Sequence, residues 1–214
     1  MIKPRHLVVI FIPAIILIIW ILYGFLSKNY QDAVKLKEIY DRDNSLDLIP
    51  ILPGDPLIGN PRAATNIIVF EDFGCDGCAA QTALLDQLLE KYPDKFNIIW
   101  KGLPVTHFPD SSEEVHSYAY CANKQGRFSA FKDIAFANNK NLSTENLKII
   151  SDTIHLDPKE LDDCLHSEFP KEKIKQVQDL AYTLNIASVP TIFIDNKEVL
   201  PQDSLEGWEA YFEL

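Results

Sequence analysis

The sequence predicts an α/β domain in which helices are inserted between two halves of one sheet, preceded by a single transmembrane helix. Three observations lead to this prediction. A strand–helix–strand pattern covers residues 65–104, helical patterns alone cover residues 105–184, and two strands and a helix follow in residues 185–214. Strands that alternate with helices are typical of α/β domains, so we expect residues 105–184 to form a helical insertion.

The amino-terminal end has the properties of a membrane anchor. Residues 7–26 carry no charge, and a helix of this length would span the ~30 Å hydrocarbon core of a bilayer. Lys3 and Arg5 precede the run, so residues 1–6 should stay in the cytoplasm. The alternative is a cleaved signal peptide, whose apolar region is usually only about 7–15 residues and ends in small residues. We therefore predict a single-pass membrane protein whose folded domain is extracytoplasmic, in the periplasm or on the outer face.

Residues 27–64 are predicted to be an extracytoplasmic spacer. The segment contains several prolines and glycines, which interrupt regular structure. Such a segment would hold the folded domain away from the bilayer.

The charge of the chain excludes one class of partner. The formal net charge is −11, from 20 basic and 31 acidic residues. A surface this acidic would repel phosphates, so we expect no nucleic-acid partner.

The first half of the domain reads as a βαβ unit. Residues 66–70 form a nearly continuous apolar run, as expected of a strand buried on both faces. Residues 79–92 follow as a helix, because apolar residues recur at spacings of three and four before Pro93. Residues 96–100 are the next strand.

The remaining elements follow from helix-start signals and short apolar runs. Ser111 and Glu114 have the spacing of a capping box, which predicts a helix start within the insertion. The last half of the domain is predicted to contain two strands and a closing helix, at residues 191–194, 198–200 and 204–214.

Cys75 and Cys78 stand where the first strand meets its helix. Unpaired N–H groups and the helix dipole stabilise a thiolate at a helix amino terminus, so Cys75 is predicted to be the nucleophile. Cys78 lies one turn further on and is predicted to be the resolving thiol of a redox disulfide. The alternative is half of a zinc site, but Cys121 and Cys164 do not form a second close pair. We therefore expect neither a metal nor another cofactor.

Val189 and Pro190 come directly before a predicted strand. Proline cannot donate to a sheet ladder and in this setting can adopt the cis form. A cis proline facing the disulfide would leave the backbone of Val189 open to an extended substrate chain, which would bind by strand addition. Both residues are therefore predicted to bind substrate.

Three segments together resemble the DsbA family of thioredoxin-fold proteins: Phe70–Cys78, Cys121–Phe128 and Ser188–Ile194. The resemblance covers about residues 60–214 and implies a thioredoxin-like fold with an inserted helical subdomain. It also implies a disulfide oxidase for exported proteins with free cysteines, recharged by a membrane quinone reductase of the DsbB or vitamin K epoxide reductase type. In this family the proline matching Pro190 is cis and the cysteine matching Cys75 is the nucleophile.

The acidic residues before Cys75 are candidates for a second role. Thioredoxins use a buried acid as proton acceptor for the second cysteine, so Glu71 or Asp72 could serve Cys78 in this way. Both side chains could instead be solvated.

The residues between the two cysteines depart from the family pattern. Family oxidases often carry Pro-His or Pro-Phe there, whereas this chain has Asp76 and Gly77. A carboxylate beside Cys75 opposes its thiolate, so we expect a raised thiol pKa and a weaker oxidant than the strongest members.

Cys121 and Cys164 each fall on a predicted helix of the insertion. Exported thiols rarely stay free, so we predict a structural disulfide, contributing about 4 kcal/mol in the chain-entropy model. The alternative is a second redox relay.

The sequence therefore favours a monomeric, membrane-anchored disulfide oxidase. One alternative is a tethered disulfide reductase, which would differ in the direction of electron flow. Another is a non-catalytic substrate-binding or chaperone domain that retains the fold.

Overall fold

The computed structural model describes residues 20, 23–24, 48–107 and 111–214. The chain divides into two units, Met1–Asp47 and Leu48–Leu214. In the first unit Trp20, Tyr23 and Gly24 are described; they are helical, and the two aromatic side chains are exposed.

Most of the predicted anchor, residues 7–26, lies outside the described residues, as does the predicted cytoplasmic end, residues 1–6. Within the part of the chain that is described, no helix has the length and apolar character needed to cross a membrane.

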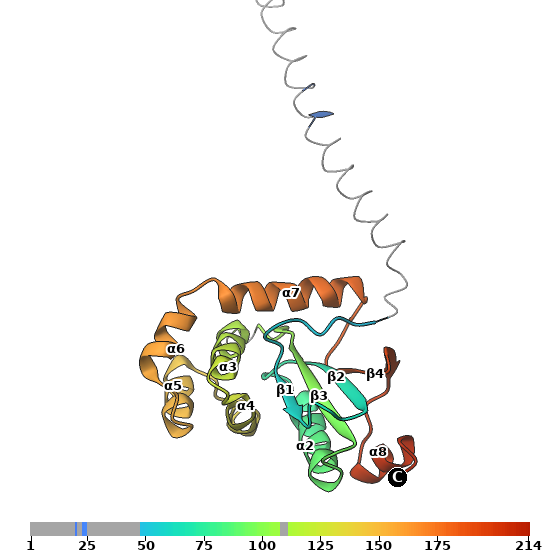
Figure 1. The fold of residues 1–214 in the computed structure, drawn as a ribbon. Coiled ribbons are helices and arrows are strands. Elements are labelled where there is room, and N and C mark those ends of the chain that lie inside the picture. The colour runs from blue at the N-terminus through green and yellow to red at the C-terminus, as the bar shows by residue number, and fades with distance from the viewer. Residues whose placement is uncertain (1–19, 21–22, 25–47, 108–110) are drawn as a thin grey trace, which may run out of the picture. The chain divides into compact units, whose positions relative to one another are not determined.

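The second unit is built on a five-stranded sheet with the order β1-β3-β2-β4-β5 (Figure 1). The strands are β1 (Leu57–Gly59), β2 (Thr65–Glu71), β3 (Phe96–Gly102), β4 (Thr191–Ile194) and β5 (Lys197–Val199). β2 and β3 are parallel, whereas β1 is antiparallel to β3, and β4 is antiparallel to both β2 and β5. All seven residues of β3 are buried, because the central strands are covered on both faces.

The described helices are placed in the order that the sequence predicts. They are α2 (Asp76–Lys91), α3 (Glu113–Lys124), α4 (Phe128–Ala137), α5 (Thr144–Thr153), α6 (Pro158–Leu165), α7 (Phe169–Thr183) and α8 (Leu205–Tyr211). α2 connects β2 to β3, and α3 to α7 form the helical insertion between β3 and β4. In Figure 1, α7 lies on one side of the sheet, and α2 and α8 lie on the other.

The folded unit begins earlier than the sequence predicts. Residues 48–64 were expected to be part of the spacer, yet β1 pairs with β3 and the side chain of Ile49 is buried. The buried carboxylate of Asp55 explains the difference, since it forms ion pairs with Lys101 of β3 and Lys173 of α7. The prolines of this segment do not prevent packing, since the carbonyl of Pro56 accepts a hydrogen bond from the backbone N–H of Trp100 at 2.9 Å.

The predicted capping box at Ser111 and Glu114 does not form. The N-cap of α3 is Ser112, which makes no side-chain capping bond. Its hydroxyl donates instead to Asp72, at 3.0 Å, because the buried carboxylate is the stronger acceptor.

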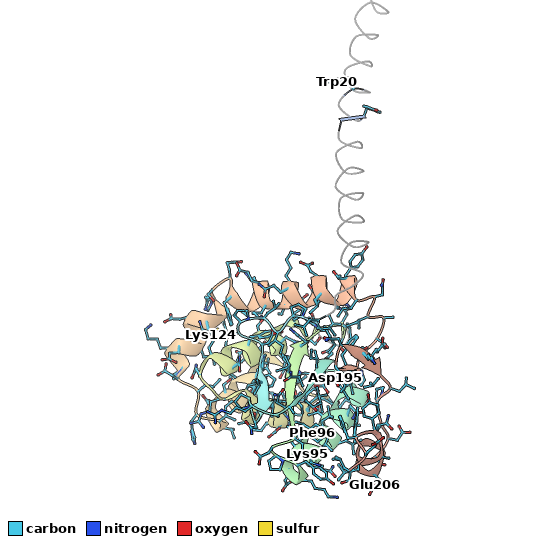
Figure 2. All side chains as sticks on the ribbon, turned by 45° about the vertical axis from the view of Figure 1, so that its right-hand side comes forward. Trp20, Lys95, Phe96, Lys124, Asp195 and Glu206 are labelled. Carbon is cyan, nitrogen blue, oxygen red and sulfur yellow. A yellow bond between two sulfur atoms is a disulfide. The ribbon has the colours of Figure 1, made fainter. Side chains whose placement is uncertain are left out.

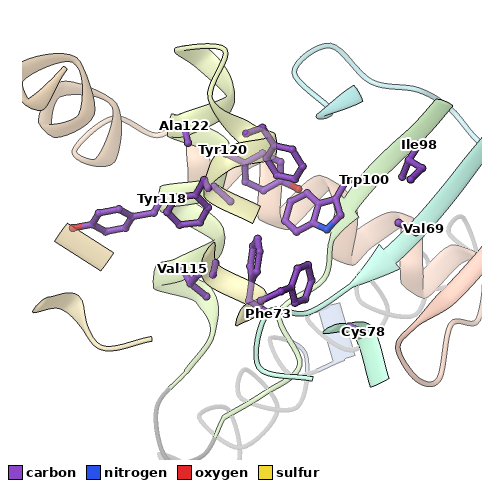
Figure 3. Close-up of a cluster of buried hydrophobic side chains, with 14 of the residues drawn as sticks. Val69, Phe73, Cys78, Ile98, Trp100, Val115, Tyr118, Tyr120 and Ala122 are labelled. Carbon is purple, nitrogen blue, oxygen red and sulfur yellow. The ribbon is translucent and has the colours of Figure 1, made fainter. Parts of the chain in front are cut away.

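Aromatic side chains join the insertion to the sheet (Figure 3). The ring of Trp100 on β3 lies 5.6 Å from that of Tyr120 on α3 and 4.9 Å from that of Phe128 on α4, measured between centroids. Phe73, in the turn after β2, lies 4.7 Å from Phe136 of α4. The insertion therefore packs directly against the strand and the turn that precede Cys75. Exposed charged side chains such as Lys124 and Glu206 point away from this core (Figure 2).

Candidate active site

Cys75 and Cys78 lie at the amino terminus of α2, and both thiols are free. Cys75 is the N-cap residue, with extended backbone angles, and its Sγ accepts a hydrogen bond from the backbone N–H of Cys78 at 3.2 Å. Cys75 is partly exposed, whereas Cys78 is fully buried. An incoming sulfur atom can therefore reach Cys75 but not Cys78.

The two thiols have opposite acid–base properties. The hydrogen bond with the Cys78 side chain, helped by the backbone N–H groups of Cys78 and Gly77, lowers the pKa of Cys75 to about 6, although burial and the charge of Asp72 oppose it. The hydrogen bond with Cys75 and burial raise the pKa of Cys78 above its ordinary value. At neutral pH the accessible sulfur is the thiolate and the buried sulfur keeps its proton.

The lowered pKa of Cys75 differs from the expectation based on Asp76. The Asp76 carboxylate accepts hydrogen bonds from Asn139 at 2.7 Å and from Lys140 at 2.5 Å. Its negative charge is thus partly offset by a cation from a distant loop, which the sequence pattern could not show.

The second predicted part of the site lies directly beside the first. The Val189–Pro190 peptide bond is cis, and Cys75 Sγ lies 3.6 Å from the carbonyl oxygen of Val189, to which it donates when it carries a proton. The proline ring packs on the residues between the cysteines, since a Cβ at Gly77 would lie 3.4 Å from Pro190 Cδ. The fold therefore brings together two sequence motifs that are 114 residues apart.

Glu71 is a buried acid that can exchange a proton near neutral pH. Glu71 is the last residue of β2 and is 1% exposed. Its carboxyl group accepts a hydrogen bond from the Thr82 hydroxyl at 2.7 Å. Burial raises the pKa of Glu71 to about 8, and the bond from Thr82 opposes this only in part. The charge of Glu71 acts on Cys78 and contributes to the raised pKa of that thiol.

Asp72 suits the predicted role of proton acceptor less well than Glu71. Burial by itself would raise the pKa of Asp72, but the hydrogen bond from His116 and those from the backbone hold it below its ordinary value. Both carboxylate oxygens are occupied by donors: Gly74 N at 3.1 Å, Val105 N at 2.8 Å, Thr106 N at 2.6 Å, Ser112 Oγ at 3.0 Å and His116 Nε2 at 3.2 Å.

Asp72 instead connects two backbone segments of the site. It holds the turn before Cys75 against the loop after β3. The two segments lie in close contact, since a Cβ atom added to Gly74 would lie only 2.7 Å from Thr106 Oγ1. Its backbone carbonyl also accepts from the N–H of Cys75 at 3.1 Å. Asp72 therefore fixes the position of Cys75 relative to the neighbouring loop.

His116 and Ser112 support Asp72, and neither residue was predicted to have a role. His116 is fully buried, stacks on Trp100 and has a pKa lowered by burial despite the neighbouring Asp72. Within the described residues its Nδ1 atom has no hydrogen-bond partner, which fits a neutral ring donating through Nε2. A histidine within an amphipathic helix carries no sequence signal that it will meet an aspartate 44 residues earlier.

Cys121 and Cys164 form a disulfide between α3 and α6, with Cα atoms 5.8 Å apart. Both residues are buried, and the bond crosslinks two helices of the insertion. Among the residues that the structure describes, no group of three or more His, Cys, Asp or Glu side chains could hold a metal ion.

Comparison with known proteins adds a family and a set of similar folds. A family model described as Thioredoxin matches residues 52–213. A thioredoxin-like oxidoreductase from Silicibacter pomeroyi superimposes with a TM-score of 0.67 at 19% identity, covering 76% of this chain and 92% of that one. The thiol-disulfide exchange protein α-DsbA2 from Wolbachia pipientis has a TM-score of 0.67 at 17% identity, and the match covers 87% of this chain and 97% of that protein. The catalytic domain of Proteus mirabilis ScsC has a TM-score of 0.64 at 18% identity, covering 75% and 88%.

Curated relatives match part of a longer protein. The chain is 23% identical over 151 residues to Na(+)/H(+) antiporter NhaA 3 of Salinispora tropica, covering 70% of this chain and 23% of the antiporter. It is 21% identical over 145 residues to Na(+)/H(+) antiporter NhaA 1 of Mycobacterium sp. (strain KMS), covering 67% and 24%. The chain thus spans about a quarter of the length of these relatives.

Proposed function

The chain belongs to the thioredoxin family, with the fold of DsbA-like thiol–disulfide oxidoreductases, and we propose that it forms disulfide bonds in exported proteins. The observation that supports this proposal is the asymmetry of the two sulfur atoms. Cys75 is accessible and has a pKa lowered to about 6, whereas Cys78 is buried and has a raised pKa. A stabilised thiolate at Cys75 favours the reduced pair, so the oxidised pair readily passes its disulfide to other thiols.

In the proposed reaction a substrate thiolate attacks Sγ of Cys75 in the oxidised pair. The Cys75–Cys78 bond breaks, a mixed disulfide forms, and Cys78 leaves as a thiolate that takes up a proton. A second substrate thiolate then attacks the substrate sulfur, which forms the product disulfide and releases the Cys75 thiolate. Two electrons pass from the substrate dithiol to the pair, and the low pKa of Cys75 makes it a good leaving group.

Glu71 would supply the proton that Cys78 takes up. Cys78 is fully buried, so water cannot protonate it directly, and the charge of Glu71 acts on this thiol. With a pKa raised to about 8, Glu71 holds a proton at neutral pH and can release it to a stronger base. In the reverse reaction, when the pair is reoxidised, Glu71 would accept that proton.

Val189 and Pro190 would bind the substrate backbone beside Cys75. The Val189 carbonyl lies 3.6 Å from Cys75 Sγ, so an extended peptide paired with this segment would place its cysteine next to the nucleophile. Recognition through the backbone would accept many different exported proteins with free cysteines.

We further propose that residues 7–26 anchor the protein in the cell membrane, with the catalytic unit outside the cytoplasm as a monomer. The uncharged run and the preceding Lys3 and Arg5 support this orientation. Each turnover leaves the pair reduced, so an oxidant must accept two electrons. A membrane quinone reductase of the DsbB or vitamin K epoxide reductase type would meet this need beside the anchor.

The decisive measurement is the reduction potential of the Cys75–Cys78 pair, with the full chain in detergent and in glutathione buffers. The expected result is a potential above about −270 mV and toward about −120 mV, the oxidising end of the known range; a potential near −270 mV would identify a reductase instead. Cys75→Ser should abolish oxidation of a reduced protein substrate. Cys78→Ser should accumulate a mixed disulfide when it is mixed with a substrate that already carries a disulfide, because Cys75 attacks that bond, releases the other sulfur as a thiolate, and no second thiol resolves the product. If Cys75→Ser left oxidation unchanged, the redox proposal would be wrong and a binding role would remain.

A further inference from the structure

The loop between α4 and α5 contacts Asp76, one of the two residues between the active-site cysteines. Asn139 donates through Nδ2 to Asp76 Oδ1 at 2.7 Å, and Lys140 Nζ lies 2.5 Å from the same oxygen. Asp76 is the first residue of α2, directly after Cys75. The helical insertion therefore contacts the redox motif at the carboxylate of Asp76.

We propose that Asn139 and Lys140 are positioning residues that set the reactivity of Cys75 by fixing the Asp76 carboxylate and offsetting its charge. The proposal rests on the function proposed above and adds a determinant outside the Cys-x-x-Cys motif. It identifies one contact through which the inserted helices act on the redox pair, beside the one that Ser112 and His116 make with Asp72.

The physical basis is the effect of a nearby charge on a thiolate. A carboxylate next to a thiolate destabilises it, by an amount that depends on where the carboxylate lies and which cations accompany it. The Asp76 side chain is 71% exposed, so without partners it would change rotamers freely. Two donors from one loop instead hold a single oxygen and place a positive charge beside it.

The acid–base state of Asp76 agrees with this arrangement. The hydrogen bonds from Lys140 and then from Asn139 lower the pKa of Asp76 below its ordinary value. Asp76 is therefore fully ionised over the range in which Cys75 titrates, and its position rather than its protonation is what can vary.

Asn139→Ala provides the sharpest test, because it removes a hydrogen bond without changing any charge. We expect it to raise the pKa of Cys75 by about 0.3 to 0.5, as suits an exposed contact, and to make the pair roughly two- to threefold harder to reduce in glutathione buffer. In an Asp76→Asn background the same substitution should have no effect. Asn138→Ala is the matched control, since the Asn138 side chain donates to the Ile134 carbonyl within α4.

Lys140→Met tests the contribution of the cation. We expect the pKa of Cys75 to rise at least as much as in Asn139→Ala, and to rise less when Asp76 is already asparagine. A pure charge effect of Lys140 on the thiolate would be the same in both backgrounds, so this double-mutant cycle separates positioning from direct attraction. Lys159→Met is the control, because Lys159 forms an exposed pair with Asp163 on α6.

The pKa of Cys75 is measured on the full chain in detergent from the ultraviolet absorbance of the thiolate, without any substrate. The proposal is overturned if Asn139→Ala leaves the pKa unchanged, or if either substitution shifts it equally with Asp76 and with Asn at that position. Failure of the proposed function would look different. The wild-type chain would then not oxidise substrate thiols, while the differences among the variants in the pKa of Cys75 would stand.

Discussion

Replacing Asp55 with alanine would test how the beginning of the folded unit is held in place. The Asp55 carboxylate is fully buried and forms ion pairs with Lys101 and, at 3.0 Å, with Lys173, whose charged groups are also buried. Lys101 donates in addition to the Pro50 carbonyl at 2.7 Å, and Lys173 to the Pro53 carbonyl at 3.1 Å. The substitution would leave two buried ammonium groups without a counterion.

The expected loss of stability follows from this burial. Removing one partner of a buried ion pair costs about 3–5 kcal/mol, because the remaining charge stays desolvated. For the unit Leu48–Leu214, which has 214 − 47 = 167 residues, this corresponds to a melting temperature lower by roughly 9–15 °C. Burial already lowers the pKa of Lys101, although Asp55 opposes this effect.

The loss of stability should depend on pH in a defined direction. Without Asp55 the folded-state pKa of Lys101 falls further, so the unfolded chain binds more protons than the folded chain. The stability of Asp55→Ala should therefore rise with pH between the lowered pKa of Lys101 in the folded chain and its ordinary value of about 10.5 in the unfolded chain.

Urea unfolding followed by circular dichroism would measure these changes. Asp163→Ala is the control, since it breaks the exposed Lys159–Asp163 pair and should cost less than about 1 kcal/mol. Exchanging Asp55, Lys101 and Lys173 together for leucine and two methionines should recover most of the loss, because no buried charge remains. The reasoning is refuted if Asp55→Ala is as stable as the wild type, or if the triple variant is no better than the single one.

Three further predictions concern the thiols and the buried acid. Cys75 in the reduced protein should titrate near pH 6, and a midpoint near 9.0 would contradict the described site. Because the folded-state pKa of Glu71 is raised from 4.5 to about 8, its contribution to stability is complete below pH 4.5 and is lost as pH rises to about 8. Glu71→Gln should remove this dependence of stability on pH. The comparison is made between proteins with Glu71 and with Gln at this position, both carrying Ser at 75 and 78 so that no thiol titrates. Replacing Cys121 and Cys164 with alanine should lower the free energy of unfolding by about 4 kcal/mol, whereas an unchanged value would argue against a structural role.

The local elements and the place of Cys75 could be predicted because they depend on neighbouring residues. The βαβ unit, the run of helices and the final strands follow from apolar periodicity, which the observed elements share. The place of Cys75 at the start of α2 follows from the strand that ends just before it. Asp157 likewise caps α6 through a bond to the N–H of Glu160, three residues away.

The electrostatics of the site could not be predicted, because they depend on groups that are distant in the sequence. Glu71 and Asp72 are adjacent acids, yet burial raises the pKa of Glu71, whereas donors from the loop after β3 and from α3 lower that of Asp72. The carboxylate of Asp76 was expected to raise the pKa of Cys75, but Lys140 from the insertion lies beside it.

The sequence by itself determined the order of elements and the place of Cys75 and Cys78 at the start of α2, because each rests on short-range patterns of apolar and helix-capping residues. Only the tertiary structure decided which acid has a raised pKa, where the folded unit begins and which side chains surround Cys75. The physical reason is that burial and charge pairing depend on distances in space. A change from solvent to a buried, hydrogen-bonded position alters the pKa of a carboxyl group by more than any neighbour in the sequence does.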